Sequence, residues 1–293
     1  MKYKSNLCNK YESWPSASDL ILDILSGYGP QGLDVQSLCR AGMVMGISET
    51  NIRVKLNRLT KERKICSPQR GYYAIDFDGY VLHADVGTWW TREQTMVAWD
   101  GSWVAVHNLG LGPGTAKQRK GLRALELRGF ASFRKGLLLR PNNLSGGVIA
   151  LRDRLQALGL GTDALVAELT ELGARDEASA RSLWIDDDYP ALYEEQLGRI
   201  QASSSHLAEI SLEEAARESL FIGRNVIRFI MHDPLLPEEL LSGDKRRLLI
   251  KQTREYQIRA RQLWADFISE GQVERSVAAK PPVVQDIFLF QNI

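Results

Sequence analysis

The sequence predicts an α+β fold, and three observations carry this prediction. Residues 16 to 75 show three short helical patterns followed by two short strands. Residues 103 to 168 show strand and helix patterns in the order β-α-β-β-α-β, and residues 175 to 270 have helical periodicity. A chain of 293 residues is long enough for two or three domains.

The composition is that of an ordinary soluble globular protein, with 44% hydrophobic and 25% charged residues. No apolar run approaches the roughly 18 residues of a membrane span, and no apolar core follows the two N-terminal lysines, so we expect neither a membrane segment nor a secretory signal. The three cysteines, Cys8, Cys39 and Cys66, are too scattered for a disulfide framework or a zinc site. They favour a reducing cytoplasm, with Cys39 as a small core residue.

The first two helices follow from apolar patterns. The segment SASDLILDILSGYG, residues 16 to 29, begins with a favourable N-cap serine and continues with apolar residues at helical spacing. The segment LDVQSLCRAGMVMG, residues 33 to 46, gives the second helix. Its apolar residues are Val35, Leu38, Cys39, Met43 and Val44. Gly46 then makes a tight turn, so that two helices meet at a glycine as in a helix-turn-helix.

The third helix has a basic outer face. In SETNIRVKLNRLTKERK, residues 48 to 64, Ser48 is a favourable N-cap and an apolar stripe follows at helical spacing. The stripe consists of Ile52, Leu56 and Leu59. The opposite side consists of Thr50, Arg53, Asn57 and Lys61, with Val54 beside them. Residues 46 to 75 hold seven basic and two acidic side chains, although the net charge of the chain is only +1. Such a face suits the DNA major groove, where Arg and Asn side chains read base edges.

A hairpin follows this helix. The segment ICSPQRGYYAI, residues 65 to 75, predicts two short strands around the turn SPQRG, with Arg70 at the tip to reach a phosphate or the minor groove. A basic helix alone is usually a solvated face, but the order helix, helix, glycine turn, basic helix and hairpin favours a winged helix-turn-helix that binds DNA. The residues expected to contact DNA are Ser48, Thr50, Arg53, Val54, Asn57, Arg58, Lys61, Lys64 and Arg70.

The central segment predicts a ferredoxin-like unit. Strand patterns at 103 to 109, at 162 to 169 and on both sides of Lys135-Gly136 alternate with helices at 115 to 129 and 146 to 159. The segment GLGPGTAKQRKG, residues 110 to 121, reads as a flexible turn into a helix. The alternative hypothesis is an anion site at the helix N-terminus for a phosphate-bearing effector such as a coenzyme A thioester. Its residues are Thr115, Lys117, Arg119 and Lys120.

The C-terminal half offers no catalytic arrangement. Two helices, at 212 to 232 after a Ser211 cap and at 245 to 268, are separated by Pro234 and Pro237. The pair His232-Asp233 reads as a helix end, and Asp100-Gly101 reads as a turn. No Ser-His-Asp, Cys-His or HExxH arrangement is present in the sequence, so we expect no enzyme, no cofactor and no metal.

These stretches resemble the PaaX family of phenylacetic-acid catabolism repressors. The segment GISETNIRVKLNRLTKERKI is similar to the family's turn glycine and recognition helix, and RGYYAI to its hairpin; the matching residues are Gly46, Arg53, Val54, Arg58, Leu59, Gly71 and Tyr73. The resemblance continues at 99 to 109 and 117 to 144, and DPLLPEELL, within 228 to 241, is similar to the family's most recognisable C-terminal motif. It leaves out only the first fifteen and about the last twenty residues.

The resemblance implies a cytoplasmic repressor of an aromatic-catabolism operon that binds a near-palindromic DNA operator as a homodimer and is released by an aryl- or acyl-CoA effector. It also implies that the central domain is similar to small CRISPR-associated ferredoxin-like nucleases. Asn108 stands where those have a metal-binding Asp, which argues against nuclease activity. The chain departs from the family at His107-Asn108-Leu109 and at LLSGDKRRLLIKQ, where a Trp-Pro-Gly segment is usual, so the effector is left open.

We therefore expect an arm at 1–15, a winged helix-turn-helix domain at 16–85, a ferredoxin-like domain at 86–172, a helical domain at 173–270 and a tail at 271–293. Leu residues and Trp264 of the helical domain are the expected dimer contact. Trp103, Phe130 and Phe133 either line an apolar effector slot or belong to the core. Two other function classes stay open: an RNA-binding or nuclease protein built on the ferredoxin-like unit, and a regulator that works through a protein partner.

Overall fold

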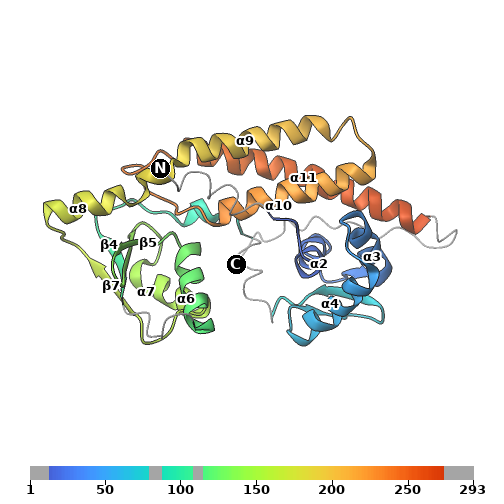
Figure 1. The fold of residues 1–293 in the computed structure, drawn as a ribbon, viewed down its shortest axis with the longest axis horizontal. Helices are drawn as coiled ribbons and strands as arrows, with labels where there is room; N and C mark the ends of the chain where they lie inside the picture. The colour runs from blue at the N-terminus through green and yellow to red at the C-terminus, as the bar shows by residue number, and fades with distance from the viewer. Residues whose placement is uncertain (1–12, 79–87, 108–114, 274–293) are drawn as a thin grey trace. The chain divides into compact units, whose positions relative to one another are not determined.

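A computed structural model gives the fold of the chain (Figure 1). It describes residues 13–78, 88–107 and 115–273, so that Cys8, Asn108 and the glycines of residues 110–114 lie outside the described residues. The described chain is an α+β protein with helices and two antiparallel sheets, as the sequence predicts. It forms two compact units. One combines Thr88–Gln196 with Ile227–Lys251, and the other combines 13–78 with Leu197–Val226 and 252–273.

The second unit contains the three N-terminal helices and their small sheet. Helices α2 (Ala17–Leu25), α3 (Val35–Val44) and α4 (Glu49–Lys61) begin after Ser16, Asp34 and Ser48, whose side chains each accept a backbone N–H of the first turn. Strands β1 (Leu33–Asp34), β2 (Ile65–Cys66) and β3 (Tyr72–Ile75) form an antiparallel sheet in the order β1-β3-β2. The three helices and the hairpin were predicted; β1 was not, because its two residues directly precede the cap of α3.

The end of α4 corrects one prediction. The helix ends at Lys61 rather than at residue 64, and Arg63 has a left-handed backbone with φ of 53°. The N–H of Lys64 donates to the Leu59 carbonyl (3.0 Å) and that of Arg63 to the Thr60 carbonyl (3.1 Å), which is the Schellman arrangement of a helix C-terminus. Glycine usually occupies the left-handed position, so an arginine there gave no sequence signal. Lys64 therefore lies in the turn into β2 and not on the helix.

The core of this unit includes residues from the C-terminal helices. Ala216 of α10 (Leu212–Met231) and Trp264, Phe267 and Ile268 of α11 (Asp244–Val273) are buried together with apolar residues of α2, α3 and α4. The Arg40 guanidinium of α3 lies 4.5 Å from the centre of the Phe267 ring, a cation–π distance. Trp264 is 5% exposed, so the prediction that it forms a dimer contact is wrong: its side chain is used inside the chain.

Buried polar groups join the C-terminal helices within the same unit. The Ser203 hydroxyl on α9 (Tyr189–His206) donates to a Glu218 carboxylate oxygen (2.7 Å) and lies 2.8 Å from the Tyr256 hydroxyl. These three residues come from α9, α10 and α11, which Figure 1 shows running beside one another. Each of the three helices also contributes residues to the first unit.

The first unit is built on a four-stranded antiparallel sheet. Its elements are β4 (Trp103–His107), α6 (Ala116–Leu127), β5 (Ala131–Arg134), β6 (Leu137–Pro141), α7 (Gly147–Ala157) and β7 (Leu165–Leu169). The order of elements along the chain is the predicted one, and the strands lie in the order β5-β6-β4-β7. Helices α6 and α7 cover one face, whereas α8 (Ala174–Arg181) and the 3₁₀ segment η2 (Ser182–Asp187) pack on the other (Figure 1).

Successive residues of β4 point to opposite faces, and this separates two of the residues expected to line one slot. Val104 packs under α6 and α7 in the cluster that holds Phe130, whereas Trp103 packs on the other face. There the Trp103 ring stacks on Trp184 at 6.2 Å, and its indole N–H donates to Glu177 (2.9 Å). Trp103 and Phe130 are therefore core residues on two sides of the sheet and do not share an apolar effector slot.

The DPLLPEELL segment is held by buried polar groups. The Asp233 carboxylate is 2% exposed and accepts the Tyr193 hydroxyl (2.5 Å) and the Leu235 N–H (2.7 Å). Burial, and then the neighbouring Asp233 charge, raise the pKa of Tyr193. Leu235 has φ of 52°, and its carbonyl accepts the Asn143 side chain (2.8 Å), which anchors this left-handed turn.

Buried arginines surround this turn. Arg92 of η1 (Arg92–Thr95) donates to the Ile230 carbonyl (2.6 Å), and Arg246 donates to Glu93 (3.0 Å). Arg140 is 1% exposed and donates to carbonyl and amide oxygens, including the Asn143 side chain (2.9 Å). Burial, followed by the charges of Arg92 and Arg128, lowers the pKa of Arg140 to about 9. These guanidinium groups satisfy backbone carbonyls that regular structure leaves open.

Two smaller sequence interpretations are confirmed in this unit. Gly101 has φ of 89°, and the Ser102 N–H donates to the Asp100 carboxylate (2.9 Å), so Asp100-Gly101 is a turn. His232 follows the last residue of α10, and its imidazole is hydrogen-bonded to the Arg228 carbonyl (2.7 Å).

The place of Trp264 in the core predicts the effect of removing it. Trp264→Ala should lower the free energy of unfolding by about 3 kcal/mol, as large-to-small substitutions of buried aromatic residues do. Ile149→Ala on α7 is the matched control: Ile149 is 66% exposed, so the change should cost less than about 1 kcal/mol. Denaturant unfolding followed by circular dichroism measures both. Equal unfolding midpoints for the two variants would contradict the burial of Trp264.

Candidate nucleic-acid interface

The predicted contact residues lie on an exposed face of α4. Thr50, Arg53, Val54, Asn57, Arg58 and Lys61 are all exposed, whereas Ile52, Leu56 and Leu59 are at most 1% exposed. Val54 is 57% exposed, which is high for an apolar side chain on a folded protein. The Ser48 hydroxyl accepts the Asn51 N–H (3.4 Å) and so caps the helix. Ser48 thus has a local structural role as the helix cap. The other side chains of this face are exposed and are available for a partner.

The turn before α4 and the hairpin after it flank this face. Gly46 has φ of 72°, and a Cβ there would meet nothing within 4 Å, so glycine is required by the backbone conformation alone. The hairpin turn between β2 and β3 has Gly71 with φ of 82°, and Arg70 beside it is exposed. The Gly71 carbonyl accepts the Val35 N–H (3.0 Å), which ties the hairpin to the first residue of α3.

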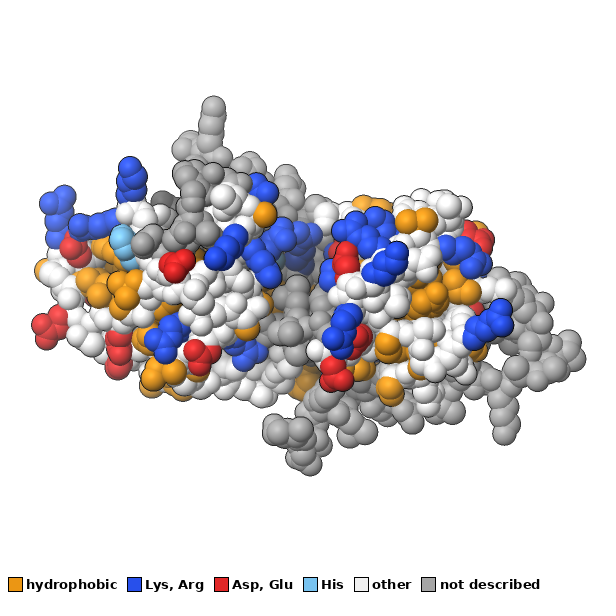
Figure 2. All heavy atoms as spheres, turned by 90° about the horizontal axis from the view of Figure 1, so that it is seen from below, with side chains coloured by type: hydrophobic (Ala, Val, Ile, Leu, Met, Phe, Trp, Pro, Cys, Tyr) orange, Lys and Arg blue, Asp and Glu red, His pale blue; other side chains and the backbone are white. Residues whose placement is uncertain are grey.

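Acidic side chains accompany the basic ones. Glu49 pairs with Arg53 (2.7 Å), and Glu62 pairs with Arg58 (2.7 Å) and Lys64 (2.8 Å). Hydrogen bonds first from Lys64 and then from Arg58 lower the pKa of Glu62 to about 2. The sequence pattern contains these two acids but does not indicate their partners. Figure 2 shows acidic side chains dispersed among the basic ones on one face of the molecule.

Three other exposed residues of this region were not expected to contact a partner. Met43, one of the apolar residues of the second predicted helix, is 61% exposed at the end of α3. Tyr72 on β3 is 37% exposed, and Phe77 after this strand is 46% exposed. One face of a strand and part of the last turn of a helix stay exposed to solvent. The apolar pattern alone does not show which residues lie on these exposed parts.

The residues of the hypothetical anion site lie together at the start of α6. Thr115 is the N-cap and accepts the Gln118 N–H (3.1 Å), and Lys117, Arg119 and Lys120 are exposed. The aliphatic stem of Lys120 packs over Gly159, where a Cβ would lie 2.6 Å from Lys120 Cδ. Lys120 therefore has a packing role besides its charge.

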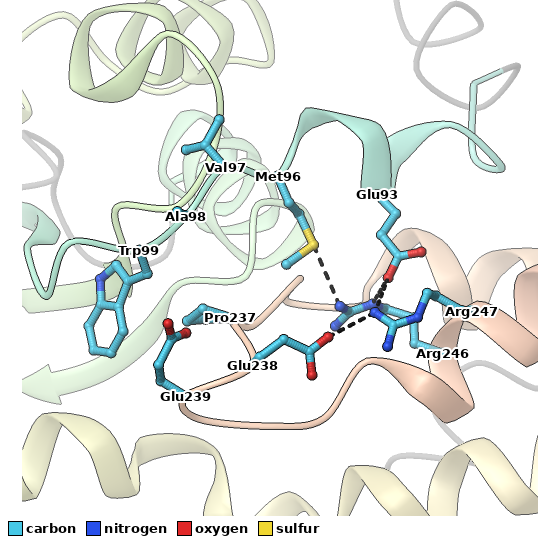
Figure 3. A pocket seen from close by; sticks show the side chains of 10 residues that line it. All are labelled: Glu93, Met96, Val97, Ala98, Trp99, Pro237, Glu238, Glu239, Arg246 and Arg247. Carbon is cyan, nitrogen blue, oxygen red and sulfur yellow. Dashed lines mark hydrogen bonds and ion pairs between the residues drawn. The ribbon is translucent and has the colours of Figure 1, made fainter.

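A cavity of about 300 Å³ lies elsewhere in the first unit (Figure 3). Met96, Val97, Trp99 and Pro237 form its apolar side, and acidic and basic residues face them. The charged residues are Glu93, Glu238, Glu239, Arg246 and Arg247. Figure 3 shows both arginines hydrogen-bonded or ion-paired to neighbours in the wall, and Arg247 also pairs with Asp244 (2.5 Å). Three carboxylates against two internally paired arginines make this cavity a poor receptor for a polyanion such as coenzyme A.

Neither a metal site nor a membrane segment is found within the described residues. No group of three or more His, Cys, Asp or Glu side chains there is arranged to hold a metal ion. In the same part of the chain, no helix combines the length and the apolar character needed to cross a membrane.

No protein-family model matches the chain. The chain is 26% identical over 208 residues to the transcriptional repressor PaaX of Escherichia coli K12, a match of 67% of this chain and 64% of that protein. The chain is similar to this repressor. The predicted resemblance to the PaaX family is thus confirmed, at a distance that leaves about a third of the relative unmatched.

A solved structure shares the fold. It is the uncharacterised protein Rv0674 from Mycobacterium tuberculosis, which superposes with a TM-score of 0.51 and is 19% identical. The match covers 88% of this chain and 99% of that one. At this identity the likeness concerns the fold alone.

Proposed function

We propose that this protein is a DNA-binding transcriptional regulator, with the winged helix-turn-helix at residues 16–85 as its DNA-binding domain. The observation that carries the proposal is the exposed polar face of α4, which is presented between the Gly46 turn and the Arg70 hairpin while the opposite face is fully buried. The similarity to a transcriptional repressor supports it independently.

In the proposed complex, α4 lies in the major groove. Arg53 and Asn57 face base edges, where Arg recognises guanine and Asn recognises adenine, and Val54 meets a thymine methyl group. Lys61 and Arg70 contact phosphates, which fix the position of the helix but carry no sequence information. Neither Lys61 nor Arg70 has an ion pair with another described residue, so both charges are available.

The finer parts of the proposal follow the predicted resemblance. We propose a repressor of an aromatic-compound catabolic operon, with a ferredoxin-like central domain that has no nuclease role. The strand order β5-β6-β4-β7, antiparallel throughout, supports the ferredoxin-like assignment.

A homodimer is part of the proposal, because one winged helix buries too little surface for tight and specific binding. With Trp264 inside the core, the contact needs other apolar residues of the C-terminal helices. Leu248 and Ile258 on α11 are 45% and 52% exposed and are the candidates.

The effector stays a prediction: an aryl- or acyl-CoA thioester, or a related free aromatic acid, that releases the protein from DNA. Its phosphates are placed at the N-terminus of α6, beside Lys117, Arg119 and Lys120. Binding must favour the state in which the two winged helices no longer match the operator, since a ligand shifts only an equilibrium that it distinguishes.

The DNA proposal is tested by selecting a duplex from a random pool with the unmodified protein and measuring binding by fluorescence anisotropy. Arg53→Ala and Asn57→Ala should each weaken binding to the selected duplex by about 1–3 kcal/mol, and Lys61→Ala should reduce the salt slope by about 1. Arg175→Ala is the control: this exposed side chain lies on α8 of the other unit, so its removal should change neither the affinity nor the salt slope. Equal losses by Arg53→Ala on selected and random duplexes would show phosphate contact only, and a preference for RNA over duplex DNA would reject the proposal.

The dimer is tested by light scattering at micromolar concentration. We expect twice the chain mass of 32.9 kDa, and Leu248→Lys with Ile258→Lys should shift the protein to the monomer, because a lysine at an apolar contact leaves a buried charge. Ile149→Lys is the matched control, since Ile149 is 66% exposed on α7. A monomer that binds the selected duplex one to one would contradict the dimer.

The effector is tested by calorimetric titration with a panel of CoA thioesters and their free acids. Lys117→Ala should weaken thioester binding roughly tenfold, as expected for the loss of one charge-assisted hydrogen bond. Lys135→Ala, on the exposed β5–β6 turn, should leave it unchanged. Unchanged thioester binding by Lys117→Ala, or binding of a free acid alone, would remove the phosphate site from the proposal.

A further inference from the structure

Glu62 bridges two of the predicted DNA-contacting cations. One carboxylate oxygen lies 2.7 Å from Arg58 Nε, and the other lies 2.8 Å from Lys64 Nζ. The Glu62 side chain is 33% exposed, and the Arg58 and Lys64 side chains are 66% and 37% exposed. A single acid at the C-cap of α4 is thus ion-paired both to Arg58 within the helix and to Lys64 in the turn that follows it.

Helix stability does not account for an acid at this position. Glu62 is the C-cap of α4, and a negative charge at a helix C-terminus opposes the helix dipole. The pair Arg58–Glu62 also has the less favourable order for an i,i+4 ion pair, with the acid on the C-terminal side. Glu49 is favourable in both respects: it lies at the N-terminus of the helix, where the dipole favours a negative charge, and it precedes its partner Arg53.

Exposed ion pairs of this kind add little to stability, typically about 0–1 kcal/mol. Such ion pairs do, however, reduce the number of cations that are available to contact phosphates. Sequence-independent DNA binding depends almost entirely on that number, because its free energy comes from the counterions that phosphate contacts release. An acid that holds two cations therefore weakens the sequence-independent complex most.

We propose that Glu62 is a specificity-determining residue, which holds Arg58 and Lys64 away from the phosphates of unrelated DNA. This inference rests on the proposed DNA-binding function. In a sequence-independent complex, α4 can bind wherever its cations contact phosphates. Glu62 reduces the binding free energy that these contacts supply. In the selected complex, base contacts by Arg53 and Asn57 fix the helix, so releasing two cations adds less.

The test is Glu62→Gln in the full chain, which keeps the shape of the side chain and removes its charge. Affinity for a random-sequence duplex should rise about threefold to tenfold at low salt. Its salt slope should steepen by about 0.9 to 1.8, the values for one and for two more phosphate contacts. Affinity for the duplex selected by the unmodified protein should rise less, so the ratio of the two affinities should fall. The melting temperature should change little, because exposed ion pairs contribute only about 0–1 kcal/mol to stability.

The matched control is Glu255→Gln, an exposed acid on α11 of the same unit. It changes the net charge of the protein by the same amount and should leave both affinities unchanged. An equal rise on both duplexes, the same rise with Glu255→Gln, or no rise at all would overturn the role of Glu62 while leaving DNA binding in place. If the unmodified protein bound no duplex, the proposed function and this inference would fail together.

Discussion

The burial of α11 residues among α2, α3 and α4 is the contact on which the candidate interface depends. Three short helices and strands of two to four residues enclose little apolar surface by themselves. Trp264, Phe267 and Ile268 add large side chains to that core. The contact is tight, since a Cβ at Gly271 would overlap the Arg40 guanidinium, which itself lies over Phe267. The geometry that presents α4 is therefore set partly by the far C-terminal helix.

The other unit depends on buried charge rather than on apolar contact alone. Asp233 and the guanidinium groups of Arg92, Arg140 and Arg246 are each less than a tenth exposed. Such groups are tolerated only when hydrogen bonds satisfy them, and here carbonyl oxygens and carboxylates do so. This explains DPLLPEELL physically: its aspartate, its left-handed Leu235 and its prolines form one anchored turn. The first half of the most recognisable part of the resemblance thus holds a core together, whereas Pro237, Glu238 and Glu239 line the cavity of Figure 3.

Among the described residues, the candidate interface contains both paired and unpaired cations. Glu49 and Glu62 pair with three of its cations, while Lys61 and Arg70 have no ion pair with a described residue. A face whose cations were all unpaired would bind any duplex and gain little from reading sequence. In the proposed DNA complex, interspersed acids would lower that general attraction and leave a larger share of the binding free energy to base contacts.

The sequence by itself determined the local features. Caps at Ser16, Ser48 and Thr115, turns at Gly46 and Gly71, and apolar spacing acted within a few residues, so the helices, the hairpin and the β-α-β-β-α-β order were predictable. The exposed face of α4 followed from the same periodicity. The tertiary structure decided where α4 ends, that Trp264 is buried within its own chain, and that Trp103 and Phe130 lie on opposite faces of a sheet. It also decided which acid pairs with which base. The helix end and these ion pairs are local, but an arginine in the left-handed position gives no sequence signal and an exposed charged side chain has several neighbours within reach. The positions of Trp264, Trp103 and Phe130 depend on which distant segments meet, and the side-chain pattern within one segment carries no information about its partner.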